Sequence, residues 1–273
     1  MIAQAAEDIE TRLVLEGIFA RYGYDLRDYE PTSMKRRVQS ALARSGARHS
    51  GELLHRLLRE PEFFVLVLND LMVQVTEMFR DPPMYLAFRR SVVSLLRTYP
   101  ELRIWHAGCA SGEEVYATAI ILSEEGLYDR TQIYATDLTD AALTRAREGV
   151  YSERQAQTFS QNYRAAGGTH SFDDYCSSGY GRMIMRDSLR KNMVFFQHSL
   201  ASDHALGEMH VVFCRNVLIY FNARLRERAL CVLSDGLVQG GFLCVGQSEV
   251  VPTGTPGFRE FERSAHIYRR GQA

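Results

Sequence analysis

The stretch LRIWHAGCASGEE (residues 102–114) combines a short apolar run, a loop of small residues and two acids. Small residues after a strand let the chain turn sharply and let a ligand lie close to the main chain. Glu113 and Glu114 fall in the first turn of the helix expected next, where the helix dipole favours negative charge. The stretch predicts strand, tight loop and helix, although an ordinary turn with solvated glutamates would read the same way.

The two acids also discriminate between nucleotide cofactors. Two carboxylates at a helix N-terminus repel a phosphate, and the loop is not the GxGxxG sequence that binds a pyrophosphate. S-adenosylmethionine (SAM) carries a sulfonium cation and an adenosine but no pyrophosphate. The loop therefore favours SAM over NAD, and a nucleotide-dependent dehydrogenase is the weaker alternative.

The sequence on the C-terminal side of residue 101 alternates between apolar runs and helical patterns. This alternation predicts an α/β fold, a parallel sheet covered by helices on both faces. Residues 150–192 are polar and partly rich in Gly and Ser, so we expect an inserted small hairpin or subdomain. The strand-like runs are 102–107, 132–136, 193–197, 210–214 and 241–245, and the helical ones are 113–125, 139–148 and 223–238.

The first hundred residues show helical periodicity and no alternating strand pattern. The sequence predicts an N-terminal helical domain at 1–83, a linker helix at 84–100 and an α/β domain at 101–273 with the insertion at 150–192. The expected helices are 9–22, 34–46, 50–60, 61–75 and 84–98.

Composition excludes several classes of protein. The 273 residues carry a formal net charge of -1, so no global charge points to nucleic acid. The longest apolar run, Phe63–Leu68, is far too short to span a bilayer, and no signal peptide is recognisable. Five cysteines without a CxxC pair indicate a reducing, cytoplasmic environment and no disulfide framework. The histidine spacing predicts no metal site.

Polar side chains follow two predicted strands at their carboxyl ends, where ligands bind in this architecture. Asp137 is placed to accept hydrogen bonds from ribose hydroxyls, although it or Thr139 could instead cap the next helix. Arg215 and Asn216 directly follow a buried strand, with a surface salt bridge as the alternative for the arginine. Periodicity alone makes Tyr220 a core aromatic.

Five ordered segments resemble the chemotaxis receptor methyltransferases, the CheR family, over nearly the whole chain. The resemblance implies an all-α N-terminal domain, then a Rossmann-like SAM-dependent methyltransferase domain with an inserted small antiparallel β subdomain. The segments are VTEMFRD (75–81), WHAGCASGEE (105–114), ATDLT (135–139), FCRNVLIYF (213–221) and GQSE (246–249).

The resemblance also nominates site residues. Tyr220 would lie by the reacting methyl group. Separately, an arginine can hold a carboxylate as a fork, so Arg80, or Arg89 or Arg90 on the helix expected next, would hold the acceptor. Ser199 replaces the usual Asn beside the adenine, and Val115 replaces a usual Pro. The implied cofactor-binding residues are Gln74, Thr76, Arg80, Gly108, Glu113, Glu114, Asp137, Ser199, Leu200, Arg215 and Asn216.

The implied reaction forms glutamate γ-methyl esters and releases S-adenosylhomocysteine (SAH). Glutamate is ionised at neutral pH, so no general base is needed. A catalytically weak SAM-binding regulator remains the alternative.

Residues 31–60 contain seven Lys and Arg against two acids, a local net charge of +5. This could be an ordinary solvated face, but the resemblance favours docking through Lys35, Arg36, Arg37 and Arg44. The expected partner is the cytoplasmic helical domain of a methyl-accepting chemoreceptor or a related signalling protein. No aromatic residue interleaves these charges, so we expect no nucleic acid as partner. We also expect no insertion into the membrane, and a monomer.

Overall fold

The computed structural model describes residues 5–73 and 76–271, and the chain forms two units. The first comprises the chain up to Val73 together with Ile219–Ala229, and the second comprises Gln74–Leu218 and Leu230–Ala273. Within the described residues, no helix combines the length and apolar character needed to cross a bilayer.

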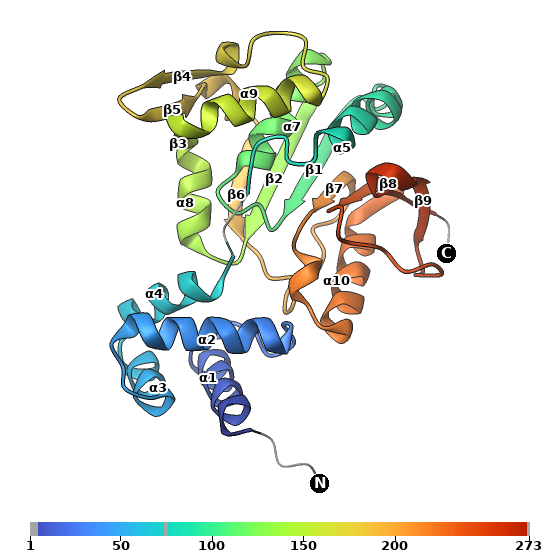
Figure 1. Ribbon diagram of the computed structural model, residues 1–273. Coiled ribbons are helices and arrows are strands. Elements are labelled where there is room, and N and C mark those ends of the chain that lie inside the picture. The colour runs from blue at the N-terminus through green and yellow to red at the C-terminus, as the bar shows by residue number, and fades with distance from the viewer. Residues whose placement is uncertain (1–4, 74–75, 272–273) are drawn as a thin grey trace. The chain divides into compact units, whose positions relative to one another are not determined.

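The N-terminal unit is helical, as expected. Pro31 and Pro61 each occupy the first position of a helix, where a missing N–H costs nothing. Gly23 and Gly46 end two helices in the left-handed conformation that glycine adopts freely. The helices, labelled in Figure 1, are α1 (Ala6–Tyr22), α2 (Pro31–Ser45), α3 (Ser50–Arg59) and α4 (Pro61–Leu71).

The second unit is built on a seven-stranded sheet in the order β6-β2-β1-β7-β8-β10-β9. The first five strands in this order are parallel, and β10 and β9 run antiparallel at one edge. β1 lies between β2 and β7, so the strand order reverses there, and ligands bind outside the carboxyl ends of strands at such a point. The strands are β1 (Leu102–Ala107), β2 (Thr131–Asp137), β6 (Met193–Gln197), β7 (Met209–Cys214), β8 (Leu237–Val245), β9 (Phe258–Glu262) and β10 (Ile267–Arg270).

Helices connect the parallel strands as the alternation predicted. The helix α7 (Glu113–Glu124) follows β1 and is almost wholly buried, whereas α8 (Asp140–Glu148) follows β2 and packs against β6 and β2. The helix α10 (Ala223–Gly236) precedes β8, which begins at Leu237, four residues before the expected strand start. The Rossmann-like fold class is confirmed.

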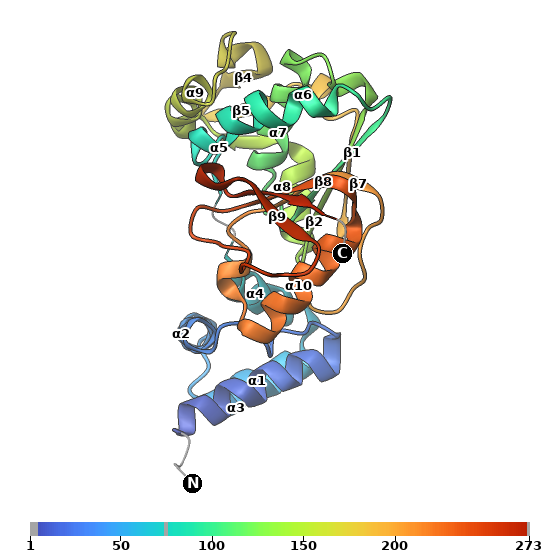
Figure 2. The ribbon, with the colours of Figure 1, turned by 90° about the vertical axis from the view of Figure 1, so that its right-hand side faces the viewer.

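The insertion forms a separate antiparallel sheet in the order β3-β5-β4. Tyr180 and Gly181 both adopt positive φ in its hairpin turn, the backbone that two-residue hairpins favour. The helix α9 (Ala156–Ala165) lies beside this sheet in both views (Figure 1, Figure 2). The small antiparallel subdomain expected at 150–192 is therefore confirmed, with strands β3 (Val150–Ser152), β4 (Cys176–Gly179) and β5 (Arg182–Met185).

Three expectations about elements differ from the structure. The single helix expected at 84–98 is α5 (Pro82–Ala87), a π-helical turn (Phe88–Val92) and α6 (Val93–Leu96). The π turn adds a residue to the helical path, and Phe88 and Val92 within it are both buried. The second unit begins at Gln74 rather than after residue 83, because Met78 and Phe79 are fully buried in its core. Strands β9 and β10 were not expected.

Candidate active site

The loop between β1 and α7 needs its small residues. Gly108, Ala110 and Gly112 all have positive φ, at 80°, 47° and 91°. A methyl group on Gly108 would fall 2.5 Å from the Val217 side chain, so only glycine fits there. The amides of Gly108 and Cys109 both donate to the Thr136 carbonyl at 2.8 Å, which holds the loop against the end of β2.

Asp137 at the tip of β2 faces this loop. Its carboxylate accepts hydrogen bonds from the Ala110 amide at 2.9 Å and the Thr139 amide at 3.2 Å. The N-cap of α8 is Thr139, whose hydroxyl accepts from the Ala142 amide at 3.4 Å. Burial raises the pKa of Asp137, while these backbone hydrogen bonds act against the rise. Because Thr139 caps the helix, the capping alternative for Asp137 is not supported.

Glu113 begins α7 with a buried carboxylate. The residue is 4% exposed, and the Ser111 hydroxyl lies 2.8 Å and 3.0 Å from its two oxygens. Burial raises the pKa of Glu113 to about 7. The alternative of a solvated glutamate is therefore wrong for this residue, since desolvation dominates its environment.

Arg215 at the end of β7 is the centre of a buried network, and a surface salt bridge is excluded. Its side chain is 1% exposed and donates to Glu114 and Asp81, both at 2.8 Å. It also donates to the Arg80 carbonyl at 2.9 Å and the Tyr85 hydroxyl at 3.3 Å. Arg215 therefore fixes the segment around residues 80–81 to the sheet.

Glu114 belongs to the same network. Its second oxygen lies 3.0 Å from His106 Nδ1, and the His106 ring stacks on Phe213. Burial alone would raise the pKa of Glu114, but the His106 hydrogen bond and the Arg215 charge lower it below its ordinary value. This carboxylate is an ion-pair partner inside the protein, which gives it a structural role beside any contact with a ligand.

Arg80 and Thr76 line a cavity of about 450 Å³. The other wall comes from the insertion, and the lining comprises Thr76, Glu77, Arg80, Gln155, Thr158 and Phe159. Arg90 is exposed on the π-helical turn. Its neighbour Arg89 is instead held by Glu124 and Glu125. Arg80, and not Arg90, therefore lines this open cavity.

Two further nominated positions follow strands of the sheet. Ser199 comes after β6, where its amide donates to the Asp203 carboxylate at 2.9 Å, and Leu200 beside it is 7% exposed. Asn216 follows Arg215 with φ at 59° and donates its amide to the Glu249 carboxylate at 2.7 Å. Gln74 lies outside the described residues.

Tyr220 belongs to the N-terminal unit. Its carbonyl accepts from the Glu30 amide at 2.8 Å, and the Arg37 guanidinium lies 4.8 Å from its ring centre. Arg37 is 9% exposed and donates to the Leu71 carbonyl at 2.6 Å. Burial lowers the pKa of Arg37. The prediction that Arg37 belongs to an exposed docking face is therefore wrong.

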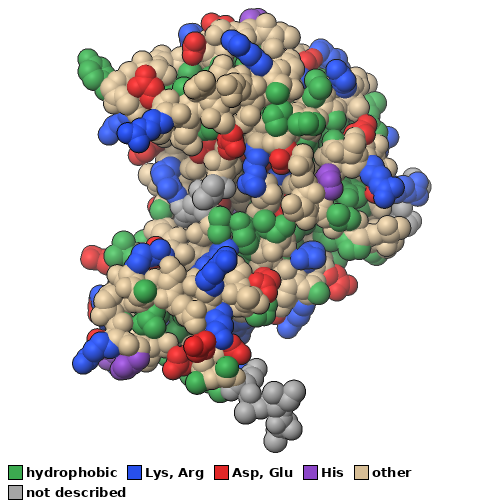
Figure 3. All heavy atoms as spheres, viewed as in Figure 1, with side chains coloured by type: hydrophobic (Ala, Val, Ile, Leu, Met, Phe, Trp, Pro, Cys, Tyr) green, Lys and Arg blue, Asp and Glu red, His purple; other side chains and the backbone are tan. Residues whose placement is uncertain are grey.

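The remaining basic residues of α2 lie at the surface. Lys35 pairs with Glu7 and Asp8, at 2.9 Å and 2.8 Å, and Arg44 pairs with Asp70 at 3.1 Å. Arg36 is exposed. Figure 3 shows basic side chains interspersed with acidic ones on the visible face, so the local excess of basic residues is partly neutralised.

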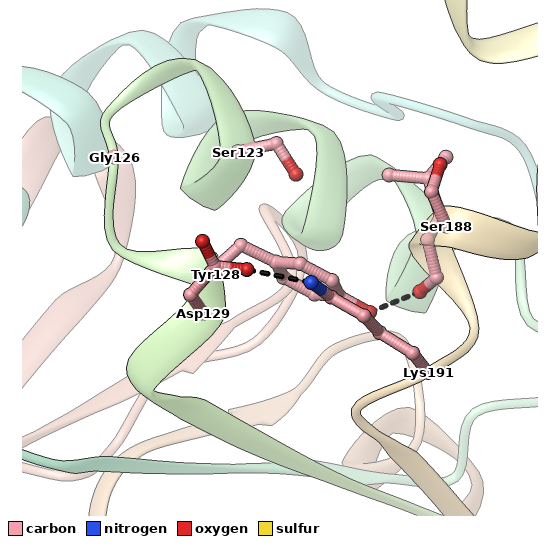
Figure 4. A pocket seen from close by; sticks show the side chains of 7 residues that line it. Ser123, Gly126, Tyr128, Asp129, Ser188 and Lys191 are labelled. Atoms are coloured by element: carbon pink, nitrogen blue, oxygen red, sulfur yellow. Dashed lines mark hydrogen bonds and ion pairs between the residues drawn. The ribbon is translucent and has the colours of Figure 1, made fainter.

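A second cavity, of about 190 Å³, lies where α7 ends and β2 begins, at the opposite edge of the sheet (Figure 4). Lys191 pairs with Asp129 at 2.6 Å, and the Tyr128 hydroxyl donates to the Leu189 carbonyl (Figure 4). In the part of the chain that the structure describes, no three His, Cys, Asp or Glu side chains gather to hold a metal ion. The loop at β1, β2 and β7 is the stronger candidate site.

Comparison with known families identifies both parts of the chain. Residues 74–267 match the domain described as CheR methyltransferase, SAM binding domain, and residues 9–72 match the CheR methyltransferase, all-alpha domain. The chain belongs to the CheR methyltransferase family. SAM is its cofactor, and the resemblance inferred from the sequence is confirmed.

Several curated CheR-type proteins are similar over most of their length. The chain is 46% identical over 251 residues to the Cher3 protein of Pseudomonas putida, which covers 92% of both chains. It is 30% identical over 231 residues to a chemotaxis protein methyltransferase of Listeria monocytogenes, covering 84% of this chain and 85% of that one. It is also 30% identical over 234 residues to chemotaxis protein methyltransferase 1 of Pseudomonas aeruginosa, covering 79% and 80%.

The CheR site has groups that suit SAM. A carboxylate such as that of Asp137 can accept hydrogen bonds from hydroxyl groups, and Glu113 is negatively charged when ionised, which suits a cofactor that carries positive charge. Arg215 Nε is buried and has no hydrogen-bond partner among residues 5–73 and 76–271, so a donor remains at this edge. Glycines at 108 and 112 leave the loop backbone uncovered by their own side chains.

The structure brings together four of the nominated CheR site residues at one end of the sheet and adds others. The ends of β1, β2 and β7 gather Gly108, Glu113, Asp137 and Arg215. Sequence reasoning missed His106 and Asp81, which complete the Arg215 network. Both residues lie inside segments that resemble the family, 105–114 and 75–81, so they could have been selected as candidates. Ion pairs between segments far apart in the sequence, however, cannot be predicted from residue spacing.

Proposed function

We propose that the chain esterifies glutamate side chains on the cytoplasmic helical domain of a methyl-accepting chemoreceptor or a related signalling protein. The observation that carries this is Arg80, which lines a 450 Å³ cavity and whose backbone is anchored by Arg215. An arginine fork suits a carboxylate acceptor. The names of the Listeria monocytogenes and Pseudomonas aeruginosa relatives support a role in chemotaxis-type signalling.

When bound, SAM supplies an electrophilic methyl group. Asp137 would hold the ribose, Glu113 the positively charged part, and Ser199 and Leu200 the adenine. Gly108, Asn216 and Thr76 would contribute contacts around them. Arg215 and Glu114 would form the buried ion pair behind this edge, and Gln74 is assigned by family resemblance alone.

The acceptor glutamate is ionised at neutral pH, so no side chain of this protein has to remove a proton. Arg80 would hold one oxygen of the acceptor carboxylate and leave the other free to attack. Phe159 and Thr158 on the facing wall would exclude water, which strengthens the ion pair and leaves the carboxylate more reactive. Tyr220 is assigned to the acceptor by family resemblance alone, and Arg90, which is exposed and does not line the cavity, is the weaker candidate for the carboxylate contact.

Docking would use the exposed Arg36, with Lys35 and Arg44 released from their intramolecular acids when a glutamate-rich helix approaches. Exposed ion pairs of this kind contribute little stability, so exchanging partners costs little. Charge complementarity of this sort mainly raises the association rate. The setting of this reaction would be the cytoplasm, with the protein as a monomer and SAH as product.

The test is transfer of tritiated methyl from SAM to a purified chemoreceptor cytoplasmic domain. We expect label on the receptor that alkali releases as methanol, because esters hydrolyse and amides do not. An Arg80→Ala variant should lose transfer by a much larger factor than it loses SAH affinity, because Arg80 would hold the acceptor as well as contact the cofactor. Tight SAM binding without any transfer would instead support a regulator that binds SAM and does not catalyse.

A further inference from the structure

The segment that follows β8 holds a buried carboxylate to which the proposed reaction gives no role. Glu249 is 3% exposed. A turn brings it back toward the strand, because its amide donates to the Gly246 carbonyl at 2.9 Å. A buried carboxylate without hydrogen-bonded partners would be strongly unfavourable, so its partners indicate its purpose.

One oxygen of Glu249 bridges the ends of two neighbouring strands. Its Oε2 accepts from the Gly246 amide at 2.6 Å and from the Asn216 amide at 2.7 Å. Cys214 and Val245 are the last paired residues of the parallel strands β7 and β8. The carboxylate thus joins the two backbones at the point where the sheet hydrogen bonds stop.

The bond to Asn216 fixes an unfavourable backbone conformation. Asn216 has φ at 59°, in the left-handed region that is unfavourable for most residues and less so for asparagine. Val217 follows and packs against Gly108, since a methyl group on Gly108 would fall 2.5 Å from Val217 Cγ2. The conformation that Glu249 stabilises is therefore the one that contacts the β1 loop.

Glu249 is itself firmly placed. A methyl group on Gly246 would fall 2.8 Å from both the Asn216 amide nitrogen Nδ2 and Glu249 Oε2, so the three residues are in close contact. The Glu249 carbonyl lies 2.8 Å from His266 Nδ1, just before β10. The antiparallel edge of the sheet thereby supports the bridge from behind.

We propose that Glu249 is a positioning residue for cofactor binding, which holds Arg215-Asn216-Val217 in the conformation that receives SAM without contacting the cofactor itself. This rests on the proposed assignment of Arg215 and Asn216 to the cofactor site. The proposal predicts that cofactor affinity depends on the Glu249 side chain, the last residue of the segment GQSE (246–249).

The experiment measures SAH affinity by calorimetry in the full chain. Glu249→Ala removes the bridge and should weaken SAH binding about tenfold or more. Glu249→Asp keeps the charge but is one methylene shorter, so it should weaken binding by a similar factor and decides the matter if the alanine variant does not fold. Glu249→Gln retains an acceptor oxygen at the same reach and should remain within about threefold of the parent.

A matched control is Glu124→Ala. The Glu124 side chain is also 3% exposed and accepts several hydrogen bonds, but it lies at the last turn of α7. The Glu124→Ala variant should have a lower melting temperature than the parent and the same SAH affinity. Hydrogen exchange of a peptide spanning residues 214–218, measured without ligand, should accelerate in Glu249→Ala and Glu249→Asp and not in the control.

Two results would overturn the proposal. One is SAH affinity unchanged in folded Glu249→Ala or Glu249→Asp. The other is an equal loss of affinity in Glu124→Ala, which would indicate general destabilisation. Both outcomes are distinct from failure of the proposed function, in which the parent protein binds SAH normally but transfers no methyl group to glutamate.

Discussion

Glu113 makes the stability of the protein depend on pH in a direction opposite to that of most carboxylates. Burial raises its pKa from 4.5 to about 7. Between these values the folded state keeps a proton that the unfolded state has lost. The unfolded state therefore binds fewer protons, and the free energy of unfolding must fall as pH rises through this interval.

The size of the effect follows from the two pKa values. Integrating the linkage relation from pH 5 to pH 8 gives a loss of roughly 2.5 kcal/mol attributable to this one group. Glu113→Gln is the matched perturbation, because its amide oxygen can still accept the Ser111 hydrogen bond but cannot ionise. The difference between parent and variant removes the contributions of all other titrating groups.

The assay is urea denaturation of both proteins at half-unit steps from pH 5 to pH 8, without cofactor. We expect the parent to lose stability relative to Glu113→Gln, most steeply between pH 5 and 7. SAH affinity of the parent should rise over pH 6 to 8, as Glu113 ionises, and stay flat in the variant. A stability difference independent of pH would refute the claim that Glu113 is buried and protonated.

Three further experiments, with five variants between them, test the site and the docking face. Asp137→Ala should weaken SAH binding by about 1.5–3 kcal/mol, because a charge-assisted contact is lost. Asp140→Ala, which removes an exposed acid, should not weaken it. Equal affinities of the two variants in calorimetry would contradict the assignment of Asp137 to the ribose. Arg36→Glu should slow receptor methylation at low salt and leave SAH affinity intact. Arg37→Glu should instead destabilise the N-terminal unit, and an unchanged melting temperature in this variant would be inconsistent with the burial of Arg37. Arg215→Met leaves two acids unpaired and should cost about 2 kcal/mol or more in urea denaturation, and a smaller loss would argue against the network.

The parallel sheet and its cofactor edge were predictable because both depend on local signals. Buried parallel strands read as apolar runs, and Asp137 stands directly at the end of one. Gly108 and Gly112 predicted a tight loop, because glycine is the residue that adopts the left-handed backbone most easily. These features follow from residues close together in the sequence.

Features that depend on distant partners were not predictable in the same way. Arg37 was assigned to the polar face of α2, yet it lies three residues after Met34 and four before Ala41, both buried. Its aliphatic stem, the Tyr220 ring and the Leu71 carbonyl make burial tolerable, and the last two come from other segments. The spacing from Met34 and Ala41 places Arg37 on the buried face of the helix, so the prediction that it lies on the polar side was wrong.

The antiparallel strands β9 and β10 were not predicted for a different reason. β9 and β10 contain FREFE and IYRR, in which charged residues interrupt the apolar pattern. β9 is the outermost strand and tolerates such charges because one side of it faces solvent, whereas β10 lies between β8 and β9 and exposes only part of its charged sequence, including Arg269. The π-helical turn was not predictable either, since Phe88 and Val92 are four residues apart, a spacing that an ordinary α-helix also places on one face.

The most direct test of the central claim is mass spectrometry of a chemoreceptor cytoplasmic domain after incubation with this protein and SAM. A transferred methyl group that replaces a glutamate hydrogen adds about 14 Da, and fragmentation assigns it to a residue type. We predict alkali-labile methylation at glutamate side chains, absent with Arg80→Ala and absent when SAM is omitted. Methylation at lysine, arginine or a backbone terminus, or none at glutamate with active SAM binding, would contradict the account.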